Sequence, residues 1–272
     1  MFLSFTNATL IDDAFANEML RVKNFIPSIS VEGFEEATDA RRGAGTFNKV
    51  TRAMALLKEK KLPFGLSCCY TSQNLDSLTS EAYFDQMVAW GAAFVWFFHY
   101  MPVGADAVPE LMVSPKQREF IYHKIRGYRK TKSIFAMDFQ NDGEYVGGCI
   151  AGGRRYLHIN ANGDADPCVF IHFSDANIHE KTLLEVLTSP LFMAYHDGQP
   201  FCENHLRPCP MLENPEKLRE IIAHTGARST DLQHPETVDD LCDRCVAYAD
   251  HWKPAADYLW AASHPVDAQS AD

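Results

Sequence analysis

The sequence lacks a hydrophobic run long enough to cross a membrane, and it lacks an excess of positive charge. Its most apolar stretch, residues 90–100, is far shorter than the ~20 residues that a spanning helix needs. There are 25 lysines and arginines against 36 aspartates and glutamates, which gives a formal net charge of −11. Nucleic acids and anionic lipid surfaces are bound through basic faces, so we expect neither a nucleic acid nor a membrane as partner. The first residues, MFLSFTNATLIDD, lack the basic start of a secretory signal, and the sequence therefore predicts a cytoplasmic protein.

Cysteine is absent from the first 67 residues, whereas six of the eight cysteines follow residue 140. In a cytoplasmic chain, such cysteines are more typical of metal sites or buried thiols than of disulfides. The cysteine-rich part of the chain is therefore where a functional site is expected.

The first 140 residues alternate short apolar runs with amphipathic segments. Strands are expected at residues 2–5, 25–31, 62–70, 93–100 and 134–138. Helices are expected at about residues 12–22, 81–90 and 115–130. Another is expected to begin at Thr46 and to extend at least to Leu57, with its apolar residues on one face. Strand–helix–strand repetition at this spacing predicts an α/β fold with parallel strands.

The regular alternation of strands and helices stops near residue 140, where we place a domain boundary. Glycines cluster there, and a hairpin is expected from residues 154–160 and 166–171 around the turn Asn162-Gly163. Helices are then expected at about 181–195, 215–224 and 238–260.

The late cysteines have spacings that suit a shared inorganic centre. Cys242 and Cys245 form a Cys-x-x-Cys pair, the hairpin returns Cys168 towards Cys149, and prolines on both sides stiffen the segment of Cys209. Zinc and iron–sulfur sites both use such pairs, and spacing alone does not decide between them. Buried thiols with no ligand role are the third alternative. Cys68, Cys69 and Cys202 are assigned no role.

Several segments resemble a known family. Gly148-Cys149, residues 156–160 and Gly163 to Cys168 resemble the start of the SPASM and twitch extensions of radical SAM (S-adenosylmethionine) enzymes. Segments of the first 104 residues resemble the third to sixth barrel strands of that family. The resemblance implies an incomplete (βα)6-type partial TIM barrel at residues 1–140, a small Cys-rich α+β iron–sulfur domain at 141–262, and a disordered tail at 263–272.

The resemblance also implies roles for individual residues. Cys149 and Cys168 would bind an auxiliary 4Fe–4S cluster, completed by two of Cys209, Cys242 and Cys245. Ser30 and Arg42 match the residues that hold the methionyl carboxylate side of S-adenosylmethionine. In the intact enzyme, a radical made from S-adenosylmethionine would abstract hydrogen from a substrate, for which a peptide is the candidate; no catalytic residue is assigned.

The sequence departs from the family in three places. The Cys-x-x-x-Cys-x-x-Cys loop and the Gly-Gly-Glu motif are absent, and Val169 replaces the aspartate base of sulfatase-maturing members. We therefore expect the chain alone to be inactive, as a truncated gene model, a fragment, or a protein whose N-terminal half is a separate partner. The sulfatase-maturing reaction is not predicted. The alternative is a non-catalytic binding module stabilised by zinc or by a cluster.

Overall fold

The computed structural model describes residues 1–265, which fold into two compact units. The first unit comprises residues 1–100 and 110–139, and the second comprises residues 101–109 together with the chain from Gln140 onward. Helix α11 (Val238–Ser263) includes the first residue of the predicted disordered tail. From residue 266 on, that tail lies outside the described residues. No helix within residues 1–265 is both long and apolar enough to span a bilayer.

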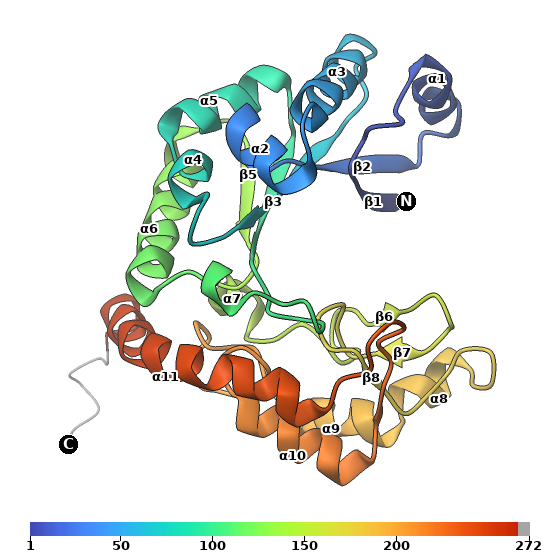
Figure 1. The fold of residues 1–272 in the computed structure, drawn as a ribbon, viewed down its shortest axis with the longest axis vertical. Coiled ribbons are helices and arrows are strands. Elements are labelled where there is room, and N and C mark those ends of the chain that lie inside the picture. Colours follow the sequence, from blue (N-terminus) through green and yellow to red (C-terminus); the bar gives the residue numbers. More distant parts are fainter. Residues whose placement is uncertain (266–272) are drawn as a thin grey trace. The chain divides into compact units, whose positions relative to one another are not determined.

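The first unit is built on a parallel five-stranded sheet whose strands follow one another in chain order (Figure 1). The strands are β1 (Phe2–Thr6), β2 (Phe25–Ser30), β3 (Gly65–Tyr70), β4 (Phe94–His99) and β5 (Phe135–Asp138). All neighbouring strands pair in parallel. The predicted α/β class is therefore confirmed, and each strand lies where the apolar runs predicted it.

Helices connect these strands, and local sequence signals set their ends. They are α1 (Asp13–Val22), α2 (Glu35–Arg42), α3 (Thr46–Glu59), α4 (Leu75–Leu78), α5 (Glu81–Trp90) and α6 (Pro115–Thr131), with a 3-10 turn at Pro109–Leu111. Asp12 caps α1, a capping box at Ser114 begins α6, and Gly91 ends α5 in the left-handed conformation. Helix α2 was not predicted, because its sequence EEATDARR has no apolar stripe.

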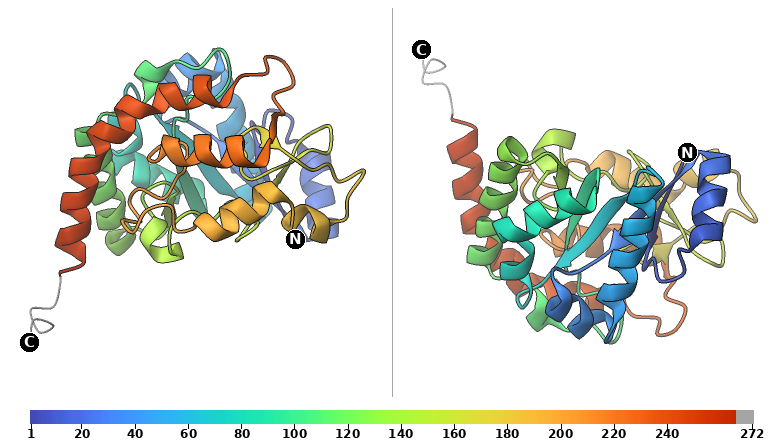
Figure 2. Two further views of the ribbon diagram at one scale, coloured as in Figure 1. Left: turned by 90° about the horizontal axis from the view of Figure 1, so that it is seen from below. Right: turned by 90° about the horizontal axis from the view of Figure 1, so that it is seen from above.

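The core of the first unit lies between the sheet and the helices that cross one of its faces; Figure 2 shows α3 and α5 against the strands. One row of paired residues across four strands, Ile29, Leu66, Val95 and Ala136, is buried in this core. Neighbouring residues along a strand point to opposite faces. The next row (Ser30, Ser67, Trp96 and Met137) therefore lies on the other face of the sheet, where it is only partly buried.

The second unit consists of short strand pairs followed by helices. Its strands are β6 (His158–Ile159) paired with β7 (Ala165–Asp166), and β8 (Phe173–Ser174) paired with β9 (Arg228–Ser229). Its helices are α7 (Gly143–Val146), α8 (Leu183–Leu187), α9 (Pro190–Gly198), α10 (Pro215–Thr225) and α11, and α10 packs between α9 and α11 (Figure 1). Gly163 adopts φ +83 at the predicted turn, but the hairpin strands are shorter than expected.

The helix predicted at 181–195 is two helices. Thr188 is the C-cap of the first helix. Ser189 caps the second, because its side chain accepts the backbone N–H of Phe192 and Pro190 occupies the first helical position. A proline in that position cannot donate a bond back to the preceding turn, so α8 and α9 remain separate.

Asp39 joins α2 to the start of α3, and the stability that this junction contributes should depend on pH. Its carboxylate accepts the backbone N–H groups of Phe47 (2.8 Å) and Gly45 (2.6 Å), which lowers the pKa of Asp39. A depressed folded pKa means that the stabilisation is present at neutral pH and is lost as the pH falls through that pKa. We expect Asp39→Asn to lower the urea midpoint at pH 7 and to match the wild type near the acid limit. The exposed Glu36→Gln variant should show no such convergence, and equal midpoints for Asp39→Asn and wild type at pH 7 would contradict this role.

Candidate metal centre

Three cysteines from separate segments of the second unit lie near one another. Besides burial, which is the main cause, a negative charge on Cys168 raises the pKa of Cys149, and charges on Cys149 and Cys168 raise the pKa of Cys209. The same three sulfurs raise the pKa values of Tyr156 and Tyr195. Because charge–charge interactions weaken with distance, these mutual effects place three thiols and two phenol groups around one region.

Backbone hydrogen bonds bring Cys149 and Cys168 together. The N–H of Gly152 donates to the carbonyl oxygen of Pro167 at 2.9 Å, which ties the segment after Cys149 to the segment before Cys168. A tight turn follows, in which the N–H of Ile171 donates to the carbonyl oxygen of Cys168 at 3.0 Å. The β6–β7 hairpin thus returns the second sulfur towards the first.

Cys209 is held by the turn that precedes α10. Its N–H donates to Oε2 of Glu213 at 2.8 Å, and its carbonyl oxygen accepts the side-chain amide of Asn214 at 3.1 Å. Glu213 is buried, and its charge also raises the pKa of Cys149. This carboxylate therefore lies close to two of the three thiols.

Each of the three sulfurs accepts a backbone N–H from a residue two or three positions further along the chain. The donors are Ala151 for Cys149, Phe170 for Cys168, and Leu212 for Cys209, the last at 3.4 Å. Hydrogen bonds to the sulfurs are among the protein features that tune iron–sulfur clusters. Each of the three segments therefore donates a backbone N–H to its own cysteine sulfur.

Burial makes all three thiols weak acids. It raises the pKa of Cys149 to about 12, raises that of Cys168, and raises that of Cys209 well above its ordinary value. Because metal ligands must be thiolates, these side chains would lose their protons only to a centre whose positive charge compensates the buried negative charge.

The polar groups of this region test whether an iron–sulfur cluster fits it. Within residues 1–265, no three His, Cys, Asp or Glu side chains are grouped so that they could hold a single ion. A 4Fe–4S cluster offers each thiolate its own iron, so its ligands need not meet at one atom. The hydroxyl of Tyr195 is buried without a hydrogen-bond partner in the structure, and the sulfurs of a cluster would supply acceptors. By this test, the residues present fit the cluster.

Cys242 and Cys245 are one turn apart on α11, and both are fully buried. Burial raises the pKa of each thiol to about 12. The Sγ of Cys242 donates to the carbonyl oxygen of Pro215 at 3.4 Å, and its main charged neighbours belong to α10 and α11. Those of Cys245 include Glu213, which also acts on Cys149 and Cys209. Of the two, Cys245 is therefore the one that shares a charged neighbour with Cys149 and Cys209.

In the first unit, Ser30 ends β2 and Arg42 ends α2. Arg42 is not a solvated charge, since its Nε donates to Oε1 of the buried Glu32 at 3.0 Å and its Nη2 pairs with the same oxygen. Glu32 also accepts the N–H of Cys69 at 3.0 Å and pairs with Arg41 at 3.3 Å. Burial raises the pKa of Glu32, and the two guanidinium groups oppose that shift. This carboxylate fixes Arg42 beside the carboxyl end of β2.

A second buried polar group lies at the carboxyl ends of β3, β4 and β5. The hydroxyl of Tyr70 donates to Oδ1 of Asp138 at 3.3 Å, and the Tyr70 ring packs edge-on against His99 with centroids 5.5 Å apart. Burial, together with the charge of Arg118, lowers the pKa of His99 to about 3, so this imidazole is neutral. Active sites of parallel barrels are built at this end of the strands.

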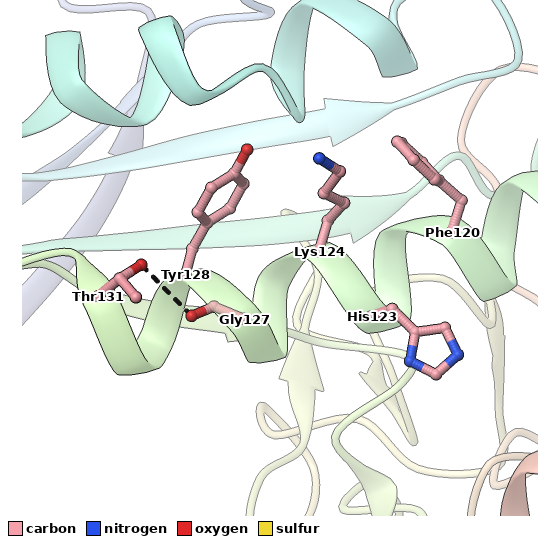
Figure 3. A pocket seen from close by; sticks show the side chains of 6 residues that line it. All are labelled: Phe120, His123, Lys124, Gly127, Tyr128 and Thr131. Carbon is pink, nitrogen blue, oxygen red and sulfur yellow. Dashed lines mark hydrogen bonds between the residues drawn. The ribbon is translucent and has the colours of Figure 1, made fainter.

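A shallow pocket on α6 contains none of the predicted site residues. Figure 3 shows that a single helix lines it, with Lys124 between the rings of Phe120 and Tyr128 and His123 pointing away. The Lys124 Nζ atom lies 5.4 Å and 5.8 Å from those two ring centres. This pocket is a groove between surface side chains rather than a built site.

Residues 149–246, which contain all the late cysteines, match the SPASM family, described as an iron–sulfur cluster-binding domain. The chain carries a SPASM domain. The predicted resemblance to radical SAM proteins with this extension is thereby confirmed, and so is the expectation of an iron–sulfur cofactor. Tyr156 lies in a segment that resembled this family but was assigned no role. Glu213 and Tyr195, which also line the cysteine region, had no recognised sequence signal, because residues distant along the chain form that region.

Part of this sequence, and most of its fold, is similar to known proteins. A cysteine-type anaerobic sulfatase-maturating enzyme of Clostridium perfringens is 38% identical over 71 residues, which are 25% of this chain but only 19% of that relative. The solved structure of native anSMEcpe with bound AdoMet and Cp18Cys peptide superposes with a TM-score of 0.55 at 17% identity, over 96% of this chain and 76% of that one. Streptococcus suis SuiB bound to the precursor peptide SuiA gives 0.52 at 18% identity, over 68% of this chain and 46% of that one. These structures support the expected radical SAM fold.

Proposed function

We propose that this chain forms part of a radical SAM enzyme and that its SPASM domain holds one auxiliary 4Fe–4S cluster through Cys149, Cys168, Cys209 and Cys245. The observation that carries the proposal is the convergence of three buried or half-buried, N–H-bonded thiols around the unpartnered hydroxyl of Tyr195. Cys245 is preferred over Cys242 as fourth ligand because Glu213 acts on Cys245 as well as on Cys149 and Cys209. Bound there, the cluster would supply an electron-transfer or substrate-binding centre.

Anaerobic reconstitution of the full chain with iron and sulfide tests this proposal. We expect about four irons per chain and the charge-transfer absorption of thiolate-bound iron. Colourless protein that retains one tightly bound zinc would overturn the assignment and favour the binding module instead. Replacing Cys245 should remove iron, whereas replacing Cys242 should not; the reverse result would move the fourth ligand to Cys242.

We assign Ser30 and Arg42 to the methionyl carboxylate of S-adenosylmethionine. Glu32 engages the Nε and Nη2 donors of Arg42, and no residue within 1–265 engages Nη1, which could pair with a carboxylate. Ser30 presents its hydroxyl at the carboxyl end of β2, on the sheet face opposite the helices. Calorimetry with S-adenosylmethionine, comparing wild type with Arg42→Ala, tests this assignment; equal binding would contradict it.

A peptide is the proposed substrate. The solved structures of similar fold include complexes with peptides. On the sheet face opposite the helices, Phe5, Trp96, Phe98 and Phe139 form an aromatic cluster, with ring centroids 5.2–6.1 Å apart. Such a surface suits an apolar peptide side chain.

We further propose that strands bearing the radical-generating cluster pair with the free edge of β1. Among the described strands, β1 is hydrogen-bonded to β2 alone, and its residues Phe2, Leu3 and Phe5 are 45–65% exposed. An exposed apolar edge strand is a template for pairing. Reading the DNA upstream of Met1, and co-expressing any polypeptide with a Cys-x-x-x-Cys-x-x-Cys loop found there, tests this arrangement. Failure of such a polypeptide to co-purify would contradict it.

A further inference from the structure

The side chain of Tyr195, on α9, is fixed in orientation by its surroundings. It is completely buried, and its ring meets Phe201 edge-on with centroids 5.4 Å apart. Gly152 packs directly on it, since a Cβ added to Gly152 would lie 2.4 Å from Cβ and 2.5 Å from Cδ1 of Tyr195. Gly152 also has φ +64, so a side chain there is disfavoured by both the backbone and the space. The ring therefore has little freedom to redirect its hydroxyl.

The hydroxyl of Tyr195 is a buried polar atom with no hydrogen-bond partner in the structure. A buried hydroxyl without a partner loses the hydrogen bonds that it makes to water in the unfolded chain, so such groups call for an explanation. Its electrostatic neighbours, after burial itself, are Cys149, Cys168, Cys209 and Tyr156. The packing of Tyr195 on Gly152, whose N–H bonds to the carbonyl oxygen of Pro167, places the phenol beside the segments of Cys149 and Cys168.

Tyr156 provides the comparison, because its hydroxyl does have a partner. Its Oη lies 2.7 Å from the Sγ of Cys168. Two phenol groups therefore border the same three sulfurs, one already bonded to a thiol and one lacking an acceptor. The sulfurs of an iron–sulfur cluster accept hydrogen bonds, and such bonds help to set its reduction potential.

We propose that Tyr195 donates a hydrogen bond to a sulfur of the cluster held by Cys149, Cys168 and Cys209 and thereby raises the cluster's reduction potential. This inference rests on the proposed function. Reduction adds negative charge to the cluster, and a hydrogen-bond donor to its sulfur stabilises that charge. The reduced form is therefore stabilised more than the oxidised form. Tyr195 is in this sense a positioning and tuning residue, without covalent contact to iron.

Redox titration of the reconstituted full chain, followed by electron paramagnetic resonance, tests the inference. We expect Tyr195→Phe to bind as much iron as the wild type and to have a more negative midpoint potential. The matched control is Tyr258→Phe on α11, whose side chain is exposed, and it should leave the potential unchanged. Equal potentials for Tyr195→Phe and wild type, with iron content intact in both, would overturn the inference and leave the proposed function standing.

A second variant covers the case in which Tyr195→Phe fails to fold or to bind iron. Placing 3-fluorotyrosine at position 195 keeps nearly the same shape but makes the phenol a stronger donor. The midpoint potential should then rise above that of the wild type, and an unchanged or lower potential would overturn the inference. Absence of iron from the wild-type protein itself would instead overturn the proposed function.

Discussion

Alanine in place of Cys168 is expected to lower the iron bound after anaerobic reconstitution from about four per chain to less than about one. Cys168 is buried at the centre of the site, where it contacts the Tyr156 hydroxyl and raises the pKa of Cys149 and Cys209. Without this thiolate, one iron would face an apolar side chain. Iron and sulfide analysis, with the visible absorption spectrum, measures the effect.

Cys202→Ala is the matched control for this experiment. Cys202 belongs to the same unit and is also a free thiol, but its sulfur lies 3.8 Å from Nη1 of Arg207 and has no role in the proposed ligand set. Its removal should leave the iron content and spectrum unchanged. Full cluster content in Cys168→Ala, or equal loss in Cys202→Ala, would contradict the proposed ligands.

Alanine in place of Glu32 is expected to cost about 3 kcal/mol of the free energy of unfolding, a large share of a typical domain's stability. The change leaves Arg41 and Arg42 without their shared carboxylate and leaves the N–H of Cys69 without its acceptor. The arginines are 38% and 26% exposed and can recover some hydration, so the loss stays at the lower end for a broken buried pair. Urea unfolding at pH 7 measures the effect.

Glu32→Gln separates the charge from the shape of this side chain. Its amide oxygen can still accept the N–H of Cys69, but it cannot neutralise two guanidinium groups, so we expect roughly half the loss. The exposed Glu36→Gln on α2 should change stability by less than about 0.5 kcal/mol. A Glu32→Ala variant as stable as the wild type would show that Arg42 does not depend on this carboxylate.

The parallel sheet could be predicted from sequence because each strand carries its own signal. The run around Val95 and Phe97 is almost continuously apolar, which is typical of a strand in a parallel sheet. Helix α2 could not be predicted, because its residues are charged and its place depends on contacts made by Glu32 and Asp39 with other segments. The pairing of β8 with β9 also escaped prediction, since Ser174 and Arg228 are far apart in the chain and two-residue strands have no readable period.

The cysteine site could likewise be predicted only in part. The approach of Cys168 to Cys149 follows from a local hairpin with Gly163 at its turn, and short-range backbone geometry suffices to predict it. The Cys-x-x-Cys spacing of Cys242 and Cys245 was an equally clear sequence pattern. Its helix, however, directs Cys242 towards Pro215, and the pattern alone could not choose between the two sulfurs.

The sequence by itself determined the order of the five parallel strands and of four helices between them, the hairpin between two cysteines, and the resemblance to radical SAM proteins with a SPASM extension. Only the tertiary structure revealed that Arg42 is bound by Glu32, that Glu213 lies beside the cysteines, and that the Tyr195 hydroxyl is buried among their sulfurs without a partner. The physical reason is that strand and turn preferences act between near neighbours in the chain. The burial and charge pairing of these groups depend instead on segments that meet only when the chain has folded.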